Sequence, residues 1–193
     1  TCTPQSTGCR TNWTSRFAAT KTGFAVTTPV LQSGLRHWDS WNMLISDLLS
    51  PEKIHCDVHS SSKKRLLELI SEDLARNSDE ASQREIFESL CARERLGSTG
   101  LGKGVAIPHG RVKGSEHVEV SFIRLKKPLP FDAIDGEPVD LLFALAVPES
   151  CGETHLKLLS QVAEIFSDPE LLKELREAEN SGMLLKLLSQ ARH

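Results

Sequence analysis

The chain has 193 residues, of which 39% are hydrophobic and 25% are charged, as is ordinary for a soluble globular domain with or without a tail. Its net charge of −3 argues against nucleic acid as the main partner, and no apolar run is long enough for membrane insertion. The five cysteines form no CxxC pair and are odd in number, which argues against a zinc site or a disulfide scaffold. Reduced thiols in the cytoplasm fit this pattern best.

Residues 1–42 differ in composition from the rest of the chain. They hold nine threonines, four serines, all three tryptophans and a single acidic residue, and no helical or strand period is sustained in them. A leader of this composition resembles an organelle transit peptide, or it is a vector-derived or untranslated-region product ahead of a start at Met43. We favour the second interpretation, and we expect a disordered extension over 1–42 and one domain over 43–193.

Apolar residues at helical spacing predict several helices in the domain. Two are expected over 62–76 and 81–94, and the second brings Arg93 to the edge of a glycine-rich stretch. The basic residues 63–65 are assigned to the solvated face of the first helix, with a partner-binding role as the alternative. Another helix begins near His155, and its buried stripe is predicted to consist of Leu156, Leu159, Val162, Ala163 and Phe166.

Strand patterns predict the layer between these helices. Short strands are expected near Ile54 and over 105–107, where the second strand ends at a histidine. Alternating residues over 117–125 suit a half-exposed antiparallel strand, and the apolar run 139–147 suits a central strand buried on both faces. The predicted fold class is α/β: a three-layer sandwich with a mixed, mostly parallel sheet of about five strands and helices on both faces.

Six of the twelve glycines lie between Gly97 and Gly114, and they surround His109, which stands between Pro108 and Gly110. Glycine suits backbone that takes positive φ or lies close to a ligand. A neutral imidazole nitrogen can attack phosphorus, and neighbouring backbone N–H groups can bind phosphate oxygens. We therefore predict a phosphate-binding loop made of Gly97, Ser98, Thr99, Gly100, Gly102, Gly104 and Gly110.

Two other interpretations of this stretch are rejected. Residues 97–103 read G-x-x-x-x-G-K, as in an ATP-binding P-loop, but Gly104 stands where Ser or Thr should bind magnesium, and no hydrophobic strand precedes the motif. A metal site built from His109, His117 and His155 is not expected, because no carboxylate or cysteine lies at ligand spacing.

Three ordered segments resemble the enzyme IIA proteins of the bacterial phosphotransferase system, in the fructose/mannitol and nitrogen-regulatory class. They are ARERLGSTGLGKGVAIPHG (92–110), FDAIDGEPVDLLFALAVPE (131–149) and THLKLLSQVAEIF (154–166). The resemblance runs from about Leu44 to the C-terminus. Because it begins immediately after Met43, it favours the second interpretation of residues 1–42.

The resemblance implies the same α/β fold and phosphoryl transfer through a phosphohistidine. It makes Nε2 of His109 the acceptor of a phosphoryl group from a histidine-containing phosphocarrier protein, and Arg93 and His155 the residues that stabilise the phosphate. Arg93 stands sixteen residues before His109, with Arg95 as the alternative. No metal, nucleotide or other cofactor is expected, because the donor is itself a phosphoprotein.

Two roles stay open for such a protein. The first is a regulator whose phosphorylation state is read by target proteins, as in the nitrogen-regulatory branch, to which STGLGKGVAIPHG and FDAIDGEPVDLLFALAVPE look closer. The second is a fructose/mannitol-type component of sugar uptake that passes phosphate to an enzyme IIB. A binding module with an inert His109 is the least favoured interpretation, because the motifs are intact.

Overall fold

The computed structural model describes residues 45–76 and 82–191, which lie in one compact unit, Arg36–His193. The expected extension over 1–42 lies outside the described residues. The elements in chain order are α1 (Ile45–Leu48), the 3-10 helix η2 (Pro51–Lys53), β1 (Ile54–Val58), α2 (Lys63–Arg76), α3 (Gln83–Arg95), β2 (Gly100–Gly102), β3 (Val105–Ala106), β4 (His109–Val112), β5 (Glu119–Leu129), β6 (Val139–Pro148), α4 (Gly152–Ile165), α5 (Pro169–Glu177) and α6 (Ser181–Gln190).

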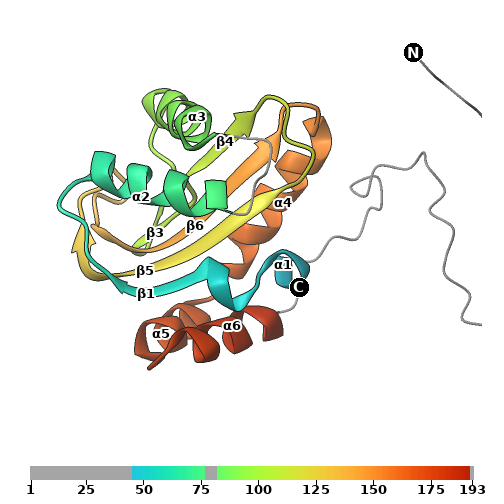
Figure 1. The fold of residues 1–193 in the computed structure, drawn as a ribbon. Coiled ribbons are helices and arrows are strands. Elements are labelled where there is room, and N and C mark those ends of the chain that lie inside the picture. Colours follow the sequence, from blue (N-terminus) through green and yellow to red (C-terminus); the bar gives the residue numbers. More distant parts are fainter. Residues whose placement is uncertain (1–44, 77–81, 192–193) are drawn as a thin grey trace, which may run out of the picture. The chain divides into compact units, whose positions relative to one another are not determined.

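One mixed sheet forms the centre of this unit (Figure 1), with the order β1-β5-β6-β3-β2 and with β4 also paired to β6. Three of its five strand pairings are parallel, namely β1 with β5 and both β3 and β4 with β6. The predicted mixed, mostly parallel sheet is therefore confirmed. It has six strands because the segment around Pro108 divides into β3 and β4, which pair with β6 one after the other.

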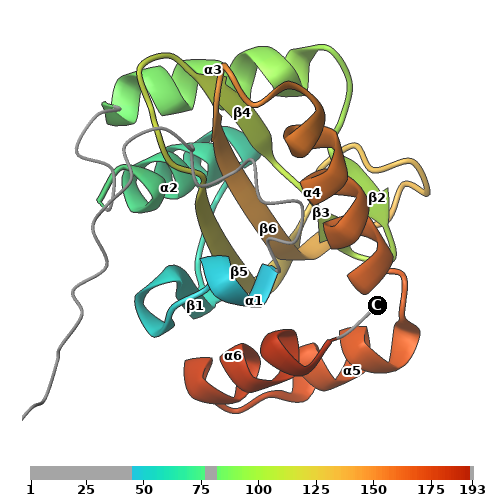
Figure 2. The same ribbon diagram turned by 90° about the vertical axis from the view of Figure 1, so that its right-hand side faces the viewer.

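Helices cover both faces of the sheet, as Figure 2 shows for α2 and α3 on one side and α5 and α6 on the other. Alternate residues of β6 enter two different cores. Leu141 and Phe143 pack with residues of α4, α5 and α6, whereas Leu142 and Ala144 pack with residues of α2 and α3. All four are at most 1% exposed, and burying each large apolar side chain stabilises the fold by about 1.5–3 kcal/mol. The predicted three-layer sandwich is confirmed.

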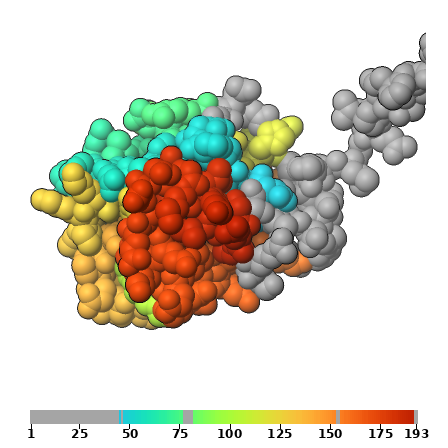
Figure 3. All heavy atoms as spheres, turned by 90° about the horizontal axis from the view of Figure 1, so that it is seen from below, coloured from blue at the N-terminus to red at the C-terminus, as the bar shows by residue number. Residues whose placement is uncertain are grey.

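The far side of the sheet from α2 and α3 is closed by the C-terminal helices, which Figure 3 shows covering that face. Asp168 begins α5 by accepting a hydrogen bond from the Glu170 N–H, as an N-cap does. Arg124 of β5 is only 8% exposed and donates through Nη1 to the carbonyls of Leu175 and Arg176 at 3.1 Å. This buried guanidinium therefore joins the sheet to the C-terminal end of α5, where backbone carbonyls lack partners within the helix.

Two details of the expected pattern are wrong. β5 is buried over its first seven residues, not half-exposed, because β1 and β6 flank it and helices cover both faces. It also continues through Pro128, with a register shift against β6 after Arg124. In α4, Leu156 is 63% exposed and Leu158 is 2% exposed, so the buried stripe contains Leu158 in place of Leu156.

Among the residues that the structure describes, no helix combines the length and the hydrophobicity that crossing a membrane requires.

Candidate active site

His109 is the first residue of β4 and is 8% exposed. Its Nδ1 lies 2.9 Å from the carbonyl oxygen of Ile107. A carbonyl can only accept a hydrogen bond, so Nδ1 carries the proton and Nε2 keeps the lone pair. The strand expected to end at the histidine instead resumes there, because His109 and the next three residues pair with β6.

Arg93, in the last turn of α3, lies against this histidine. Its Nε donates to Nε2 of His109 at 3.0 Å, and its Nη1 donates to the carbonyl of Gly97 at 3.0 Å. The helix approaches β4 this closely because residue 110 is glycine: a Cβ there would lie 2.6 Å from Oγ of Ser89. Of the two candidate arginines, Arg93 contacts His109, while Arg95 faces a groove between α2 and α3.

His155, in the first turn of α4, is the second histidine of the site and is 5% exposed. Its ring meets the ring of His109 edge to face, with centroids 5.2 Å apart. Arg111 Nε donates to Nδ1 of His155 at 3.3 Å, so the proton of a neutral His155 lies on Nε2. That buried Nε2 has no hydrogen-bond partner among the described residues, which leaves a donor available.

The electrostatic environment keeps both imidazoles uncharged at neutral pH. Burial lowers the pKa of His109 below its ordinary value, and the charge of Arg93 adds to this effect. Burial also lowers the pKa of His155, to about 4, with contributions from His109, Arg111 and Arg93. A neutral His109 has a nucleophilic lone pair on Nε2, and a neutral His155 has one N–H donor.

The loop after α3 is held in place by Glu94. The Glu94 carboxylate accepts hydrogen bonds from the backbone N–H of Thr99 at 3.2 Å and from its hydroxyl at 2.6 Å, and it pairs with Lys63 at 2.7 Å. Ser98 donates to the carbonyl of Phe131 at 2.6 Å and accepts from the N–H of Gly100. The N–H groups of Thr99 and Gly100 are thus engaged inside the loop. The assignment of Lys63 to a solvated face is wrong, because it bridges α2, α3 and Asp132.

Gly102 and Gly104 lie elsewhere: Gly102 ends β2, and Gly104 lies in the turn that leads to β3. Both take positive φ, 93° and 78°, as a tight turn requires. β3 begins opposite Leu141, whereas His109 pairs with Leu145, so four residues, or about 13 Å of strand, separate the turn from the histidine. The structure does not support placing these two glycines in a phosphate-binding loop.

Sequence reasoning missed Arg111 and Glu94. Arg111 follows His109 by two residues on β4, and side chains two apart on a strand share a face, so this spacing was an available signal. No comparable signal marks Glu94, whose partners come from a loop and from α2. Within 45–76 and 82–191, no group of three His, Cys, Asp or Glu side chains is placed to hold a metal ion.

A three-layer α/β fold that places a neutral histidine between an arginine and a second histidine is the arrangement expected of a phosphotransferase-system enzyme IIA. The chain belongs to the family described as "Phosphoenolpyruvate-dependent sugar phosphotransferase system, EIIA 2", whose model matches residues 47–191.

Within that family, the chain is similar to nitrogen regulatory proteins. The one from Klebsiella oxytoca is 43% identical over 148 residues, which are 76% of this chain and 91% of that protein. The crystal structure of nitrogen regulatory protein IIA-Ntr from Neisseria meningitidis is also 43% identical, with a TM-score of 0.71 over 75% of this chain and 98% of that one. The fructose-specific EIIABC component from Bacillus subtilis is 28% identical over 77% of this chain and 23% of its own length.

Proposed function

We propose that this protein accepts a phosphoryl group on Nε2 of His109 from a histidine-containing phosphocarrier protein in the cytoplasm, and that its phosphorylation state regulates partner proteins. The proposal depends above all on one observation: the Ile107 carbonyl fixes the proton on Nδ1, which leaves the lone pair on Nε2, beside Arg93. Only the nitrogen with the lone pair can attack phosphorus.

The reaction exchanges one nitrogen–phosphorus bond for another. The lone pair of His109 Nε2 attacks the phosphorus of the donor phosphohistidine, and the donor imidazole leaves with the electron pair of its own bond. In the free protein the Nε–H of Arg93 donates a hydrogen bond to that lone pair. Arg93 must therefore release it and bind the phosphate oxygens, for which its planar fork is suited.

Two further groups stabilise the phosphorylated form. The ring of His109 becomes positively charged on phosphorylation, and the hydrogen bond from Nδ1–H to the Ile107 carbonyl stabilises that charge. The Nε2–H of His155, which has no partner among the described residues, donates to a phosphate oxygen, an interaction that strengthens as charge develops during transfer. Positioning and electrostatics thus supply the catalysis.

The test is phosphorylation of the full chain by phosphoenolpyruvate, enzyme I and the phosphocarrier, followed by mass spectrometry and phosphorus NMR. The phosphate should be found on His109, with the chemical shift of an Nε2-linked phosphohistidine. His109→Ala should abolish labelling, while the exposed His117→Ala serves as the control and should label normally. Phosphate on another residue would overturn the assignment, and no labelling at all would favour a binding module.

The regulatory role is favoured over sugar uptake because nitrogen regulatory proteins are the more similar relatives, at 43% identity against 28% for the fructose-specific component. The second role stays a candidate because that component belongs to the same family. A transfer assay separates the two: phosphorylated protein is mixed with a fructose- or mannitol-type enzyme IIB. Rapid and complete transfer to enzyme IIB would contradict a mainly regulatory role.

A further inference from the structure

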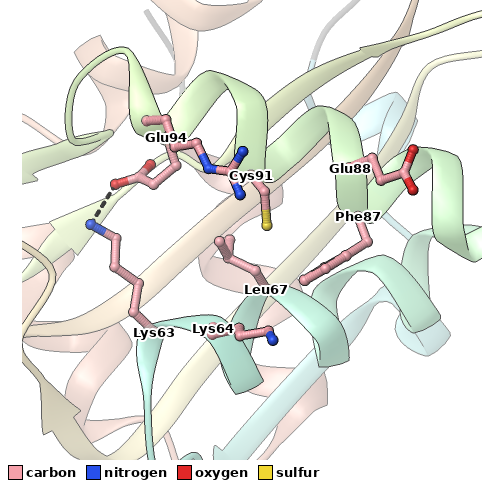
Figure 4. Close-up of a pocket in the computed structure, with 8 residues that line it drawn as sticks. Lys63, Lys64, Leu67, Phe87, Glu88, Cys91 and Glu94 are labelled. Carbon is pink, nitrogen blue, oxygen red and sulfur yellow. Dashed lines mark ion pairs between the residues drawn. The ribbon is translucent and has the colours of Figure 1, made fainter.

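A groove of about 650 Å³ lies between α2 and α3 (Figure 4). Its volume is within the range of about 300–1,000 Å³ that is typical of small-molecule sites. Arg95 lines it, whereas Arg93 on the same helix contacts His109. The groove is therefore a surface that the proposed phosphoryl transfer does not use.

The floor of the groove is apolar. Leu67 of α2 and Phe87 of α3 lie between the two helices, and the sulfur of Cys91 points toward Leu67, as Figure 4 shows. Burial raises the pKa of the Cys91 thiol, so this thiol is protonated and adds to the apolar surface at neutral pH. Apolar surface that stays accessible to a ligand favours binding of a hydrocarbon or aromatic group.

The charges around this floor are unbalanced. Both acidic residues of the groove already have partners: Glu94 pairs with Lys63 at 2.7 Å, and Glu88 pairs with Arg84 at 2.8 Å. Lys64 and Arg95 form no ion pair with any residue in the described part of the chain.

The charges of Arg95 and Lys64 act on the Cys91 thiol, which places both cations close to the apolar floor. Two acidic side chains, Glu68 and Glu94, also act on this thiol, but Glu68 is paired with Arg65 and Glu94 with Lys63. The groove therefore combines an apolar floor with an uncompensated positive rim.

We propose that this groove binds an amphipathic carboxylate, a small molecule with one carboxylate group and an apolar body. The apolar body lies on Leu67, Phe87 and Cys91. The carboxylate lies at the rim, where the planar guanidinium of Arg95 can bind both of its oxygens and the ammonium of Lys64 adds a second positive charge.

Such a ligand would lie against the ion pair that orders the loop after α3. Lys63 and Glu94 line the groove, and the same Glu94 carboxylate holds Thr99. The groove is therefore placed to connect a metabolite signal with the loop beside Arg93, whether or not His109 is phosphorylated.

The proposal is tested by titrating the ¹⁵N-labelled full chain with sodium octanoate and, separately, with 1-octanol, which has the same apolar body without the charge. Octanoate should shift the amides around Lys64 and from Phe87 to Arg95 in a saturable way, and should bind at least tenfold more tightly than octanol. Octanoate should also slow the alkylation of Cys91 by iodoacetamide, with Cys56, a partly buried thiol of β1, as the internal reference.

Charge reversal gives the decisive comparison. Lys64→Glu/Arg95→Glu should weaken octanoate binding at least tenfold and leave octanol binding unchanged. The matched control is Lys173→Glu/Lys186→Glu, which makes the same change of net charge at exposed positions of α5 and α6. If the charge-reversal variant unfolds, Lys64→Gln/Arg95→Gln replaces it. Equal affinity for the two probes, unchanged binding in these variants, or saturable shifts only outside the groove would each overturn the proposal.

Discussion

The buried imidazole of His155 offers the sharpest test of how the site works. In the free protein its Nε2–H is buried and has no partner within the described residues, and its ring is neutral because its pKa is about 4. A hydrogen bond to a charged group contributes about 1.5–3 kcal/mol, which corresponds to about ten- to a hundredfold in rate. We expect His155→Ala to be labelled on His109 still, but more slowly by a factor in this range.

The assay is rapid-quench transfer from labelled phosphocarrier to wild type and variants. His155→Gln retains an N–H donor and should recover part of the rate, while His117→Ala should transfer at the wild-type rate. Because His155 is neutral well above pH 4, the ratio of wild-type to His155→Ala rates should stay constant between pH 6 and pH 8. Wild-type transfer in His155→Ala would refute this role.

An increase of that ratio as the pH falls from 8 to 6 would also contradict the reasoning, because it would mean that the imidazolium is the active form. Folding must be measured in parallel. His155 is only 5% exposed, so its truncation is expected to lower the free energy of unfolding by about 1–3 kcal/mol through lost packing. Denaturant unfolding of both variants separates this effect from the transfer rate, since His155→Gln should retain more of the packing.

Three further outcomes are expected. Arg93→Lys keeps the charge but loses the planar fork, so pre-steady-state transfer should slow about tenfold, or by about 1.4 kcal/mol; a wild-type rate would exclude bidentate binding by this residue. Arg111→Ala removes one charge that lowers the pKa of His155, so an NMR titration should show this pKa raised, and an unchanged value would contradict the contact. Burial raises the pKa of Asp73, but hydrogen bonds from His55 and Ser121 outweigh this effect, so the pKa in the folded protein lies below its ordinary value. The ionised carboxylate therefore stabilises the fold above about pH 4, and this contribution is lost as the pH falls further. In Asp73→Asn, the free energy of unfolding should consequently decrease less at acidic pH than it does in the wild type.

The layers of the fold could be predicted because each depends on a local pattern. The run from Val139 to Val147 is apolar at every position but one, and only a strand covered on both faces tolerates that pattern. Helical spacing likewise predicted α2 and α3 to within two residues at each end. Burial of β5 on both faces was not predictable, because the alternation of its residues does not report that helices cover both faces of the sheet or that β1 pairs along its outer edge.

The many glycines indicated where the backbone takes unusual conformations or close contacts, but not which structural role each glycine has. Gly110 permits α3 to pack on β4 beside the histidine. Gly104 instead lies in a hairpin turn, where Arg176 and Asp140 occupy the space that a Cβ at residue 104 would need. Both glycines stand in the same stretch of sequence. Their different places follow from the pairing of β3 and β4 with β6, which involves residues more than 30 positions further along the chain and cannot be read from the glycines' own neighbours.

Arg111 could be overlooked for a reason that also explains its place in the site. Side chains two residues apart on a strand lie on the same face, which places Arg111 beside His109. The strand predicted from the sequence ended at His109, so this rule could not be applied to Arg111. Its partner, His155, is 44 residues further along the chain and comes from a helix. β4 and the first turn of α4 therefore contribute the site jointly: one strand face carries the imidazole with the lone pair and the arginine that sets the tautomer of the second imidazole. A substitution at Arg111 should consequently act through His155, which its effect on the pKa of that histidine will show.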